Sequence, residues 1–256
     1  MSLVLYFVSI FSFTFITFII GKYIASCLKI ENNDYQISNF AEYALFGIIF
    51  ISFSALTLNF FTKLSPEVNT SFFIIFFLIA LFSLVKNVAI IIKAVKYSIL
   101  CSLITGVTLM FDNVNTPDAG MYHLPYVSIL NIDKISIGIN NIQHRYGFIS
   151  ILQYLSAISN NILFTKNGIT ISLCTLYSIL IIFFFNEFKR EKNNLLKFLS
   201  SVFLIFSLYE FNRFSEHGND EISFMIYFLC ILYFFKTIIY KNESFKKLIL
   251  ITGFSI

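Results

Sequence analysis

The feature that most constrains this chain is a series of long runs that contain almost no charged residue. The first run covers residues 3–20, and comparable runs recur to the end of the chain. A bilayer core is about 30 Å thick and is crossed by about 20 residues of helix. Each run is therefore a candidate membrane-spanning helix, and the alternating pattern of barrel strands is absent from the sequence.

Composition supports this interpretation. Hydrophobic residues make up 57% of the chain, charged residues make up 12%, and the mean hydropathy is +0.81. A soluble domain of 256 residues cannot hide so much apolar surface in one core. We expect an all-α integral membrane protein with about seven or eight transmembrane helices in a single domain over residues 1–256. The expected spans are 3–20, 41–61, 71–92, 94–111, 168–185, 195–209, 222–239 and a run from residue 248. Because that last run is too short to cross a membrane, we expect a fragment truncated at its C-terminal end.

The positions of Lys and Arg predict which helix ends face the cytoplasm. Cytoplasmic connections are enriched in these residues. Most of the 18 Lys and Arg residues fall in connections that would share one side, namely 21–40, 86–96, 186–197 and 236–247. The other side would have only Lys63, Lys134, Arg145, Lys166 and Arg213. We therefore expect the N terminus and the loops at 112–167 and 210–221 to be extracytoplasmic.

The loop at 112–167 is the longest connection, and its composition is not that of a flexible linker. It has few glycines, the apolar residues within 122–130 recur at helical spacing, and 148–164 is a further apolar run. We expect a structured loop whose helices lie along the membrane surface or dip into it without crossing.

The loop begins with a polar cluster in an otherwise apolar chain. Thr116 and Pro117 match a helix N-cap followed by proline at the first helical position. This places Asp118 in the first turn, where the helix dipole stabilises a carboxylate. Asp118 is thus either a helix-stabilising acid or a catalytic one. Asp112, at the mouth of the fourth expected span, is the reserve candidate.

The residues after Asp118 extend the cluster. Asp118 and Tyr122 are four residues apart and share a face of a helix, with His123 beside them. Pro125 lacks a backbone N–H and crowds the preceding turn, so we expect the helix to end or kink after His123.

Two further polar patches are predicted on the same side. In the first, NIQHRYGF at 141–148, Arg145 is suited to hold a phosphate and His144 to exchange a proton; the alternative is that both anchor the loop at headgroup level. The second patch lies at 210–223, where Asp220 and Glu221 could merely cap the next helix. Its candidate binding residues are Arg213, Glu216, His217 and Asp220. No fixed ligand spacing supports a metal site, and no glycine-rich phosphate loop or GxSxG motif is present.

The segments PDAGMYHLP, N-x-x-x-R-x-G-F at 141–148 and SEHGND at 215–220 together resemble a family of polytopic membrane proteins from bacterial surface-polysaccharide loci. These proteins are similar to GT-C type glycosyltransferases. The resemblance implies a polyprenyl phosphate or diphosphate sugar as donor, a glycan or lipid acceptor, and a bacterial inner membrane location. No cofactor is implied, a divalent cation remains open, and no nucleic acid is involved.

In such enzymes an external carboxylate near the start of the first loop acts as general base on the acceptor hydroxyl. Asp118 matches that position and Asp112 is second, although here the loop follows the fourth expected span instead of the first. We expect the remaining candidates to bind the substrate and its phosphate, namely Tyr122, His123, His144, Arg145, Arg213, Glu216, His217 and Asp220. The alternatives are a polysaccharide polymerase or ligase, a lipid-linked glycan transporter or flippase, and a structural membrane subunit.

Overall fold

The computed structural model describes residues 3–30, 37–84, 88–110, 117–147, 150–211, 217, 220–240, 247–249 and 252–253. Regular structure in these residues is helical, apart from an isolated bridge between Asn161 and Thr165. The elements are α1 Leu3–Cys27, α2 Ile37–Phe61, α3 Pro66–Leu84, α4 Val88–Met110, the π-helix η1 Ala119–His123, α5 Leu124–Ile132, the 3-10 helices η2 Ile139–Asn141 and η3 His144–Gly147, α6 Ile151–Ser159, α7 Gly168–Arg190, α8 Asn194–Tyr209 and α9 Asp220–Tyr240.

Among the described residues, five helices are long and apolar enough to cross a membrane. Their apolar segments are Val4–Cys27, Phe40–Phe61, Ala89–Met110, Gly168–Arg190 and Glu221–Tyr240. The apolar segments of α3 and α8 are shorter, Pro66–Phe82 and Asn194–Tyr209. The all-helical architecture is therefore confirmed, whereas the expected total of seven or eight spans stays a prediction.

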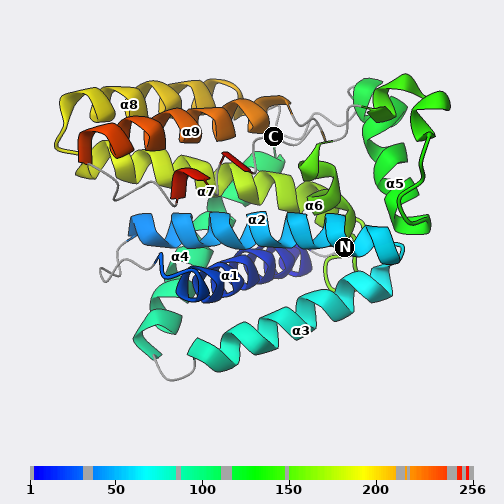
Figure 1. The fold of residues 1–256 in the computed structure, drawn as a ribbon. Helices are drawn as coiled ribbons and strands as arrows, with labels where there is room; N and C mark the ends of the chain where they lie inside the picture. The colour runs from blue at the N-terminus through cyan, green and yellow to red at the C-terminus, as the bar shows by residue number, and fades with distance from the viewer. Residues whose placement is uncertain are drawn as a thin grey trace.

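The helices form a bundle around α7 (Figure 1), which contacts α1, α2, α4, α6, α8 and α9. Consecutive long helices run in alternating directions. The N-terminal ends of α1, α3 and α7 and the C-terminal ends of α2 and α4 lie at the end of the bundle where α5 projects. We call this the α5 end, and the opposite one the basic end. The order matches the alternation that the positions of Lys and Arg predict.

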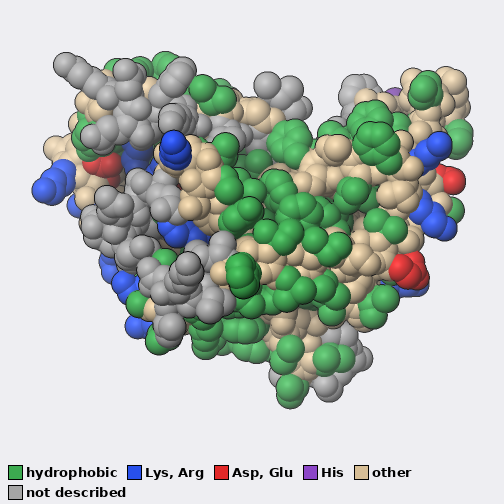
Figure 2. Space-filling view, turned by 60° about the horizontal axis from the view of Figure 1, so that its bottom comes forward, with side chains coloured by type: hydrophobic (Ala, Val, Ile, Leu, Met, Phe, Trp, Pro, Cys, Tyr) green, Lys and Arg blue, Asp and Glu red, His purple; other side chains and the backbone are tan. Residues whose placement is uncertain are grey.

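The outer surface explains why such a bundle suits a membrane. Large apolar side chains point outward on α3, α4, α8 and α9, for example Phe82, Ile92, Ile205 and Ile238. Figure 2 shows hydrophobic side chains across the middle of the molecule and charged side chains gathered toward both sides of the view. Apolar contact with lipid in the middle and charge near the two water layers is the pattern of a polytopic helical membrane protein.

Glycines allow α1 and α2 to pack closely along their length. A Cβ atom built on Gly21 would lie 1.6 Å from the carbonyl oxygen of Tyr43, and one built on Gly47 would lie 1.8 Å from the carbonyl oxygen of Thr17. Helices in membranes associate through small residues of this kind, which let the two backbones approach each other.

Two details of the expected spans are wrong. Residues 88–92 belong to α4 and not to the preceding span, because α4 continues through Lys93, whose exposed side chain does not interrupt the helix. Lys22 was expected in a cytoplasmic connection, but α1 extends to Cys27 and buries Lys22 with its ammonium group 4.6 Å from the centre of the Tyr43 ring.

Asparagine side chains fix the loop to the bundle at the α5 end. The amide of Asn69 donates to the carbonyl oxygens of Leu64 and Ala157 at 2.9 Å and lies 2.8 Å from that of Asn160. The amide of Asn131 donates to the same carbonyls of Leu64 and Ala157, at 2.7 and 2.9 Å, and accepts from Asn160 at 2.8 Å. These bonds join the α2–α3 turn to the C-terminal ends of α5 and α6.

The helix α6 lies inside the protein and not on its outside. It is buried from Leu152 to Ser159 and contacts α2, α5 and α7, so of the two expected placements for 148–164 only a segment that dips into the membrane without crossing stays a prediction. Tertiary contacts make this burial possible. The asparagine network donates hydrogen bonds to carbonyl groups at the C-terminal end of α6, so these groups do not need water as a partner.

Candidate functional site

The predicted catalytic segment forms a continuous helix from Pro117 to Ile132 that changes type midway. In the π-helical turn η1, the N–H of Leu124 donates to the carbonyl of Ala119, five residues earlier. Pro125 then lies in the first turn of α5, directly after η1, and has no N–H to donate to the carbonyl groups of that preceding turn. The expected break after His123 is therefore a change from π-helix to α-helix.

Asp118 and Arg145 form the centre of the site. The Nη1 atom of Arg145 donates to Oδ1 of Asp118 at 2.8 Å, and the two side chains are 42% and 52% exposed. Asp118 makes no capping hydrogen bond through its side chain. This hydrogen bond also raises the pKa of Arg145. The structure thus assigns Asp118 a partner that neither of the two sequence interpretations included.

Aromatic side chains extend this pair along one face of the helix. The guanidinium carbon of Arg145 lies 4.5 Å from the centre of the Tyr122 ring, which is cation–π geometry. The Tyr122 and His123 ring centres are 4.2 Å apart, with the planes at 44°. The Nδ1 atom of His123 lies 3.4 Å from Nε2 of Gln153 in α6. Four sequence-predicted residues from two patches are therefore brought together.

Three buried tyrosines hold this arrangement in place. The ring of Tyr146, next to Arg145, packs 5.4 Å from that of Tyr126 in α5. The Tyr126 hydroxyl is hydrogen-bonded to that of Tyr154 in α6, and burial raises the pKa of both phenols. Because Tyr146 anchors η3 inside the fold, Arg145 is presented toward Asp118 on the outside. Sequence reasoning missed Gln153 and Tyr154, although a polar side chain within the apolar run 148–164 was a usable signal.

The other predicted site residues are placed less completely. His144 is exposed on η3 beside Arg145, and His217 lies before α9 with a left-handed backbone, φ 60°. Asp112, Arg213 and Glu216 lie outside the described residues, as does the side chain of Asp220 at the start of α9. The third patch therefore stays a prediction. No group of three or more His, Cys, Asp or Glu side chains suited to a metal ion occurs in the described part of the chain.

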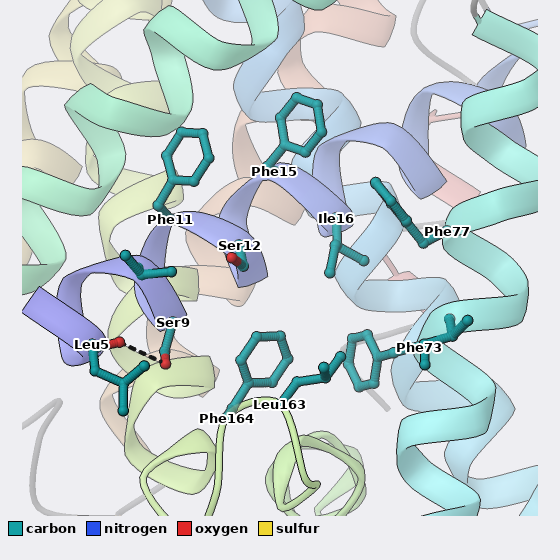
Figure 3. A pocket seen from close by; sticks show the side chains of 12 residues that line it. Leu5, Ser9, Phe11, Ser12, Phe15, Ile16, Phe73, Phe77, Leu163 and Phe164 are labelled. Atoms are coloured by element: carbon teal, nitrogen blue, oxygen red, sulfur yellow. Dashed lines mark hydrogen bonds between the residues drawn. The ribbon is translucent and has the colours of Figure 1, made fainter. Parts of the chain in front are cut away.

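Two apolar grooves flank α1 toward the α5 end of the bundle. The first has a volume of about 440 Å³ and lies between α1, α3 and the segment after α6. Its walls include Phe11, Phe15, Phe73, Phe77 and Phe164, whose rings surround the opening in Figure 3. The second, of about 520 Å³, lies between α1 and α4 beside Gly106. Both grooves are suited to hydrocarbon chains.

A group of buried charged residues at the basic end was missed entirely. Lys247 donates to Glu42 at 2.6 Å, Tyr233 donates to the other oxygen of Glu42 at 2.6 Å, and Lys236 pairs with Glu187. These five residues form what we call the inner ion cluster. The sequence signal for this cluster was the position of Glu42 and Glu187 at the margins of apolar runs. A charged side chain inside a membrane bundle is unfavourable unless it is paired, so each carboxylate indicates a partner.

Comparison with known proteins gives a family but no activity. No curated protein and no solved structure matches the chain. One family model matches it over residues 1–256. The chain therefore belongs to the family described as Domain of unknown function (DUF8201).

Proposed function

We propose that this protein is a membrane glycosyltransferase of the bacterial inner membrane. It transfers a sugar from a polyprenyl phosphate or diphosphate donor to a surface-glycan acceptor on the extracytoplasmic face. The observation that carries the proposal is the half-exposed Asp118–Arg145 pair, which combines a base and an anion-binding group at one end of an apolar bundle.

The two members of the pair match the two charges that the reaction must manage. The acceptor hydroxyl attacks the anomeric carbon, the bond from that carbon to the phosphate oxygen breaks, and the hydroxyl proton passes to a base. Asp118 is that base, while Arg145 meets the departing phosphate. The grooves beside α1 are the proposed position of the polyprenyl chain, since hydrocarbon binds where apolar surface is open.

The ion pair gives the reaction an order. An exposed ion pair of this kind adds little to stability, so replacing the contact of Arg145 with Asp118 by a contact with phosphate requires little free energy. Arg145 has five N–H donors and Asp118 accepts from one of the two on Nη1, which leaves the others for a phosphate. A bound phosphate therefore shares the guanidinium with Asp118 and weakens the Asp118–Arg145 attraction, so the carboxylate becomes a better base when the leaving group is in place.

The test is Asp118→Asn in cells that depend on the protein for surface glycan. We expect glycan transfer to be abolished, because the amide cannot accept the proton, while membrane insertion and protein level are unchanged. Asp133→Asn is the matched control, since Asp133 is an exposed carboxylate at the end of α5. Unimpaired transfer by Asp118→Asn contradicts the proposal, and so does a reporter that places the 112–167 loop in the cytoplasm.

The inner ion cluster favours a second candidate, a transporter of a lipid-linked glycan. Buried ionisable groups in membrane helices often belong to ion or substrate pathways. Glu42→Gln distinguishes the two functions: it should stop movement of a fluorescent lipid-linked sugar across proteoliposomes if the protein is a transporter. Measured per molecule of folded protein, it should leave sugar transfer on the external face intact if the protein is a transferase.

A further inference from the structure

Gln153 is a buried polar residue that no expectation from the sequence includes. It lies in α6 with 7% of its surface exposed, between apolar neighbours such as Leu152 and Leu155. Its Nε2 atom lies 3.4 Å from Nδ1 of His123. Its Oε1 atom is buried and has no hydrogen-bond partner in the described part of the structure.

Stability does not explain an amide at this place. A buried carbonyl oxygen without a partner is unfavourable relative to an apolar side chain of similar length. If the oxygen and nitrogen of the Gln153 amide change places, the oxygen contacts His123 and the nitrogen becomes the buried atom without a partner. One amide atom is therefore unpaired in either orientation. The contact with His123 is what a methionine or leucine would lose.

With the Gln153 amide nitrogen facing the ring, that contact selects one of the two neutral states of the imidazole. A neutral histidine has one ring nitrogen that donates and one that accepts. When Nε2 of Gln153 donates to Nδ1 of His123, the ring proton is on the histidine Nε2 atom, on the opposite side of the ring. The same ring packs at a tilt against Tyr122, which lies under Arg145, so its orientation is held from two directions.

We propose that Gln153 is a positioning residue that fixes His123 in the Nε2–H tautomer. His123 then donates a hydrogen bond from that atom to a phosphate oxygen of the substrate, beside the guanidinium of Arg145. The role in substrate binding rests on the proposed function, whereas the tautomer and orientation of His123 do not. A neutral donor next to an arginine stabilises the growing charge on a leaving phosphate without a proton having to move.

The experiment uses the full chain in detergent, with ¹⁵N-labelled histidine. The chain has only three histidines, so His123→Asn assigns the His123 signals directly. We expect the parent protein to show the Nε2–H tautomer at His123. Gln153→Met should give a mixture of tautomers, and Gln153→Glu should move the proton to Nδ1, because a carboxylate only accepts.

Stability and activity are measured on the same variants. Gln153→Met should melt at the same temperature as the parent or higher, since it removes the unpartnered carbonyl, while glycan transfer falls by up to about 100-fold from the misplaced donor. Leu155→Met is the control: it changes a buried side chain of the same helix without touching His123.

The outcomes separate this inference from the proposed function. A lower melting temperature of Gln153→Met with unchanged His123 signals makes the amide a structural group and overturns the inference. If Gln153→Met shifts the tautomer while Asp118→Asn leaves transfer intact, the positioning stands and the proposed reaction fails. If Asp118→Asn abolishes transfer and Gln153→Met changes neither signals nor transfer, the inference fails alone.

Discussion

Arg145 shows how much a single residue can determine in this site. It contacts the Asp118 carboxylate with one donor and the face of the Tyr122 ring with its guanidinium plane. A planar, delocalised cation serves both contacts, and its raised pKa keeps it charged at every relevant pH. Lysine has the same charge but neither the plane nor the fork of donors.

We therefore expect Arg145→Lys to lower glycan transfer, and Arg145→Ala to lower it further, by about 100-fold, as when a donor to a developing anion is removed. Thermal unfolding should be unchanged in both variants, because exposed ion pairs contribute little to stability. Lys134→Met, at another exposed cation of the same loop, is the control. Equal activity of the lysine variant and the parent contradicts a role for the guanidinium geometry.

Individual site residues were predictable where local chemistry decides their place. The spacing of Asp118, Tyr122 and His123 along a helix gave their common region correctly, and the structure adds Arg145 to it. That Asp118 pairs with Arg145, 27 residues later, was not readable, because the approach of η3 to η1 depends on the packing of buried tyrosines.

At the scale of elements, close contact between helices depends on the absence of a side chain. Gly47 is in the middle of α2, where helix propensity alone would favour alanine. Its backbone lies against Thr17 of α1, and a Cβ atom would meet that carbonyl oxygen at 1.8 Å. A Cβ atom built on Gly106 in α4 would meet no atom within 4 Å.

Gly47→Ala should therefore separate α1 from α2 and destabilise the protein by about 1–3 kcal/mol, as overpacking does in other cores. Gly106→Ala should be neutral or slightly stabilising, because alanine favours a helix and nothing obstructs it. Thermal unfolding in detergent compares the two variants directly. A loss of equal size in both would show that helix propensity, and not contact, governs these positions.

Elements were predictable to the extent that hydropathy marks them. Apolar runs located α2, α7, α8 and α9 closely, as well as the start of α1, since each run needs a helix to satisfy its backbone in lipid. The division between α3 and α4 was misplaced because a lysine at a helix end is compatible with both a loop and a helix. The burial of α6 depends on contacts to Asn69 and Asn131, which are distant in sequence.

At the scale of the whole molecule, the two ends of the bundle use charge differently. The α5 end presents an ion pair to the outside, while the basic end buries its inner ion cluster between helices. Counting Lys and Arg assigned Lys236 and Lys247 to a cytoplasmic connection. The count predicts a side of the membrane and carries no information on depth, because a buried lysine and a solvated one look alike in a sequence. Lys247 and Glu42 are 205 residues apart, so only the folded chain reveals their pairing.

The inner ion cluster should therefore behave as a coupled unit that holds the segment at Lys247 against α2 and α9. Lys247→Met removes one cation and leaves Glu42 buried with an unbalanced charge, which should cost about 3–5 kcal/mol. Glu42→Gln alone leaves the buried ammonium group without its carboxylate and should cost a similar amount. The double variant removes both charges, so its loss should be clearly smaller than the sum of the two single losses. A double-mutant cycle on thermal unfolding in detergent measures this coupling, and strictly additive losses would mean that the two residues act independently.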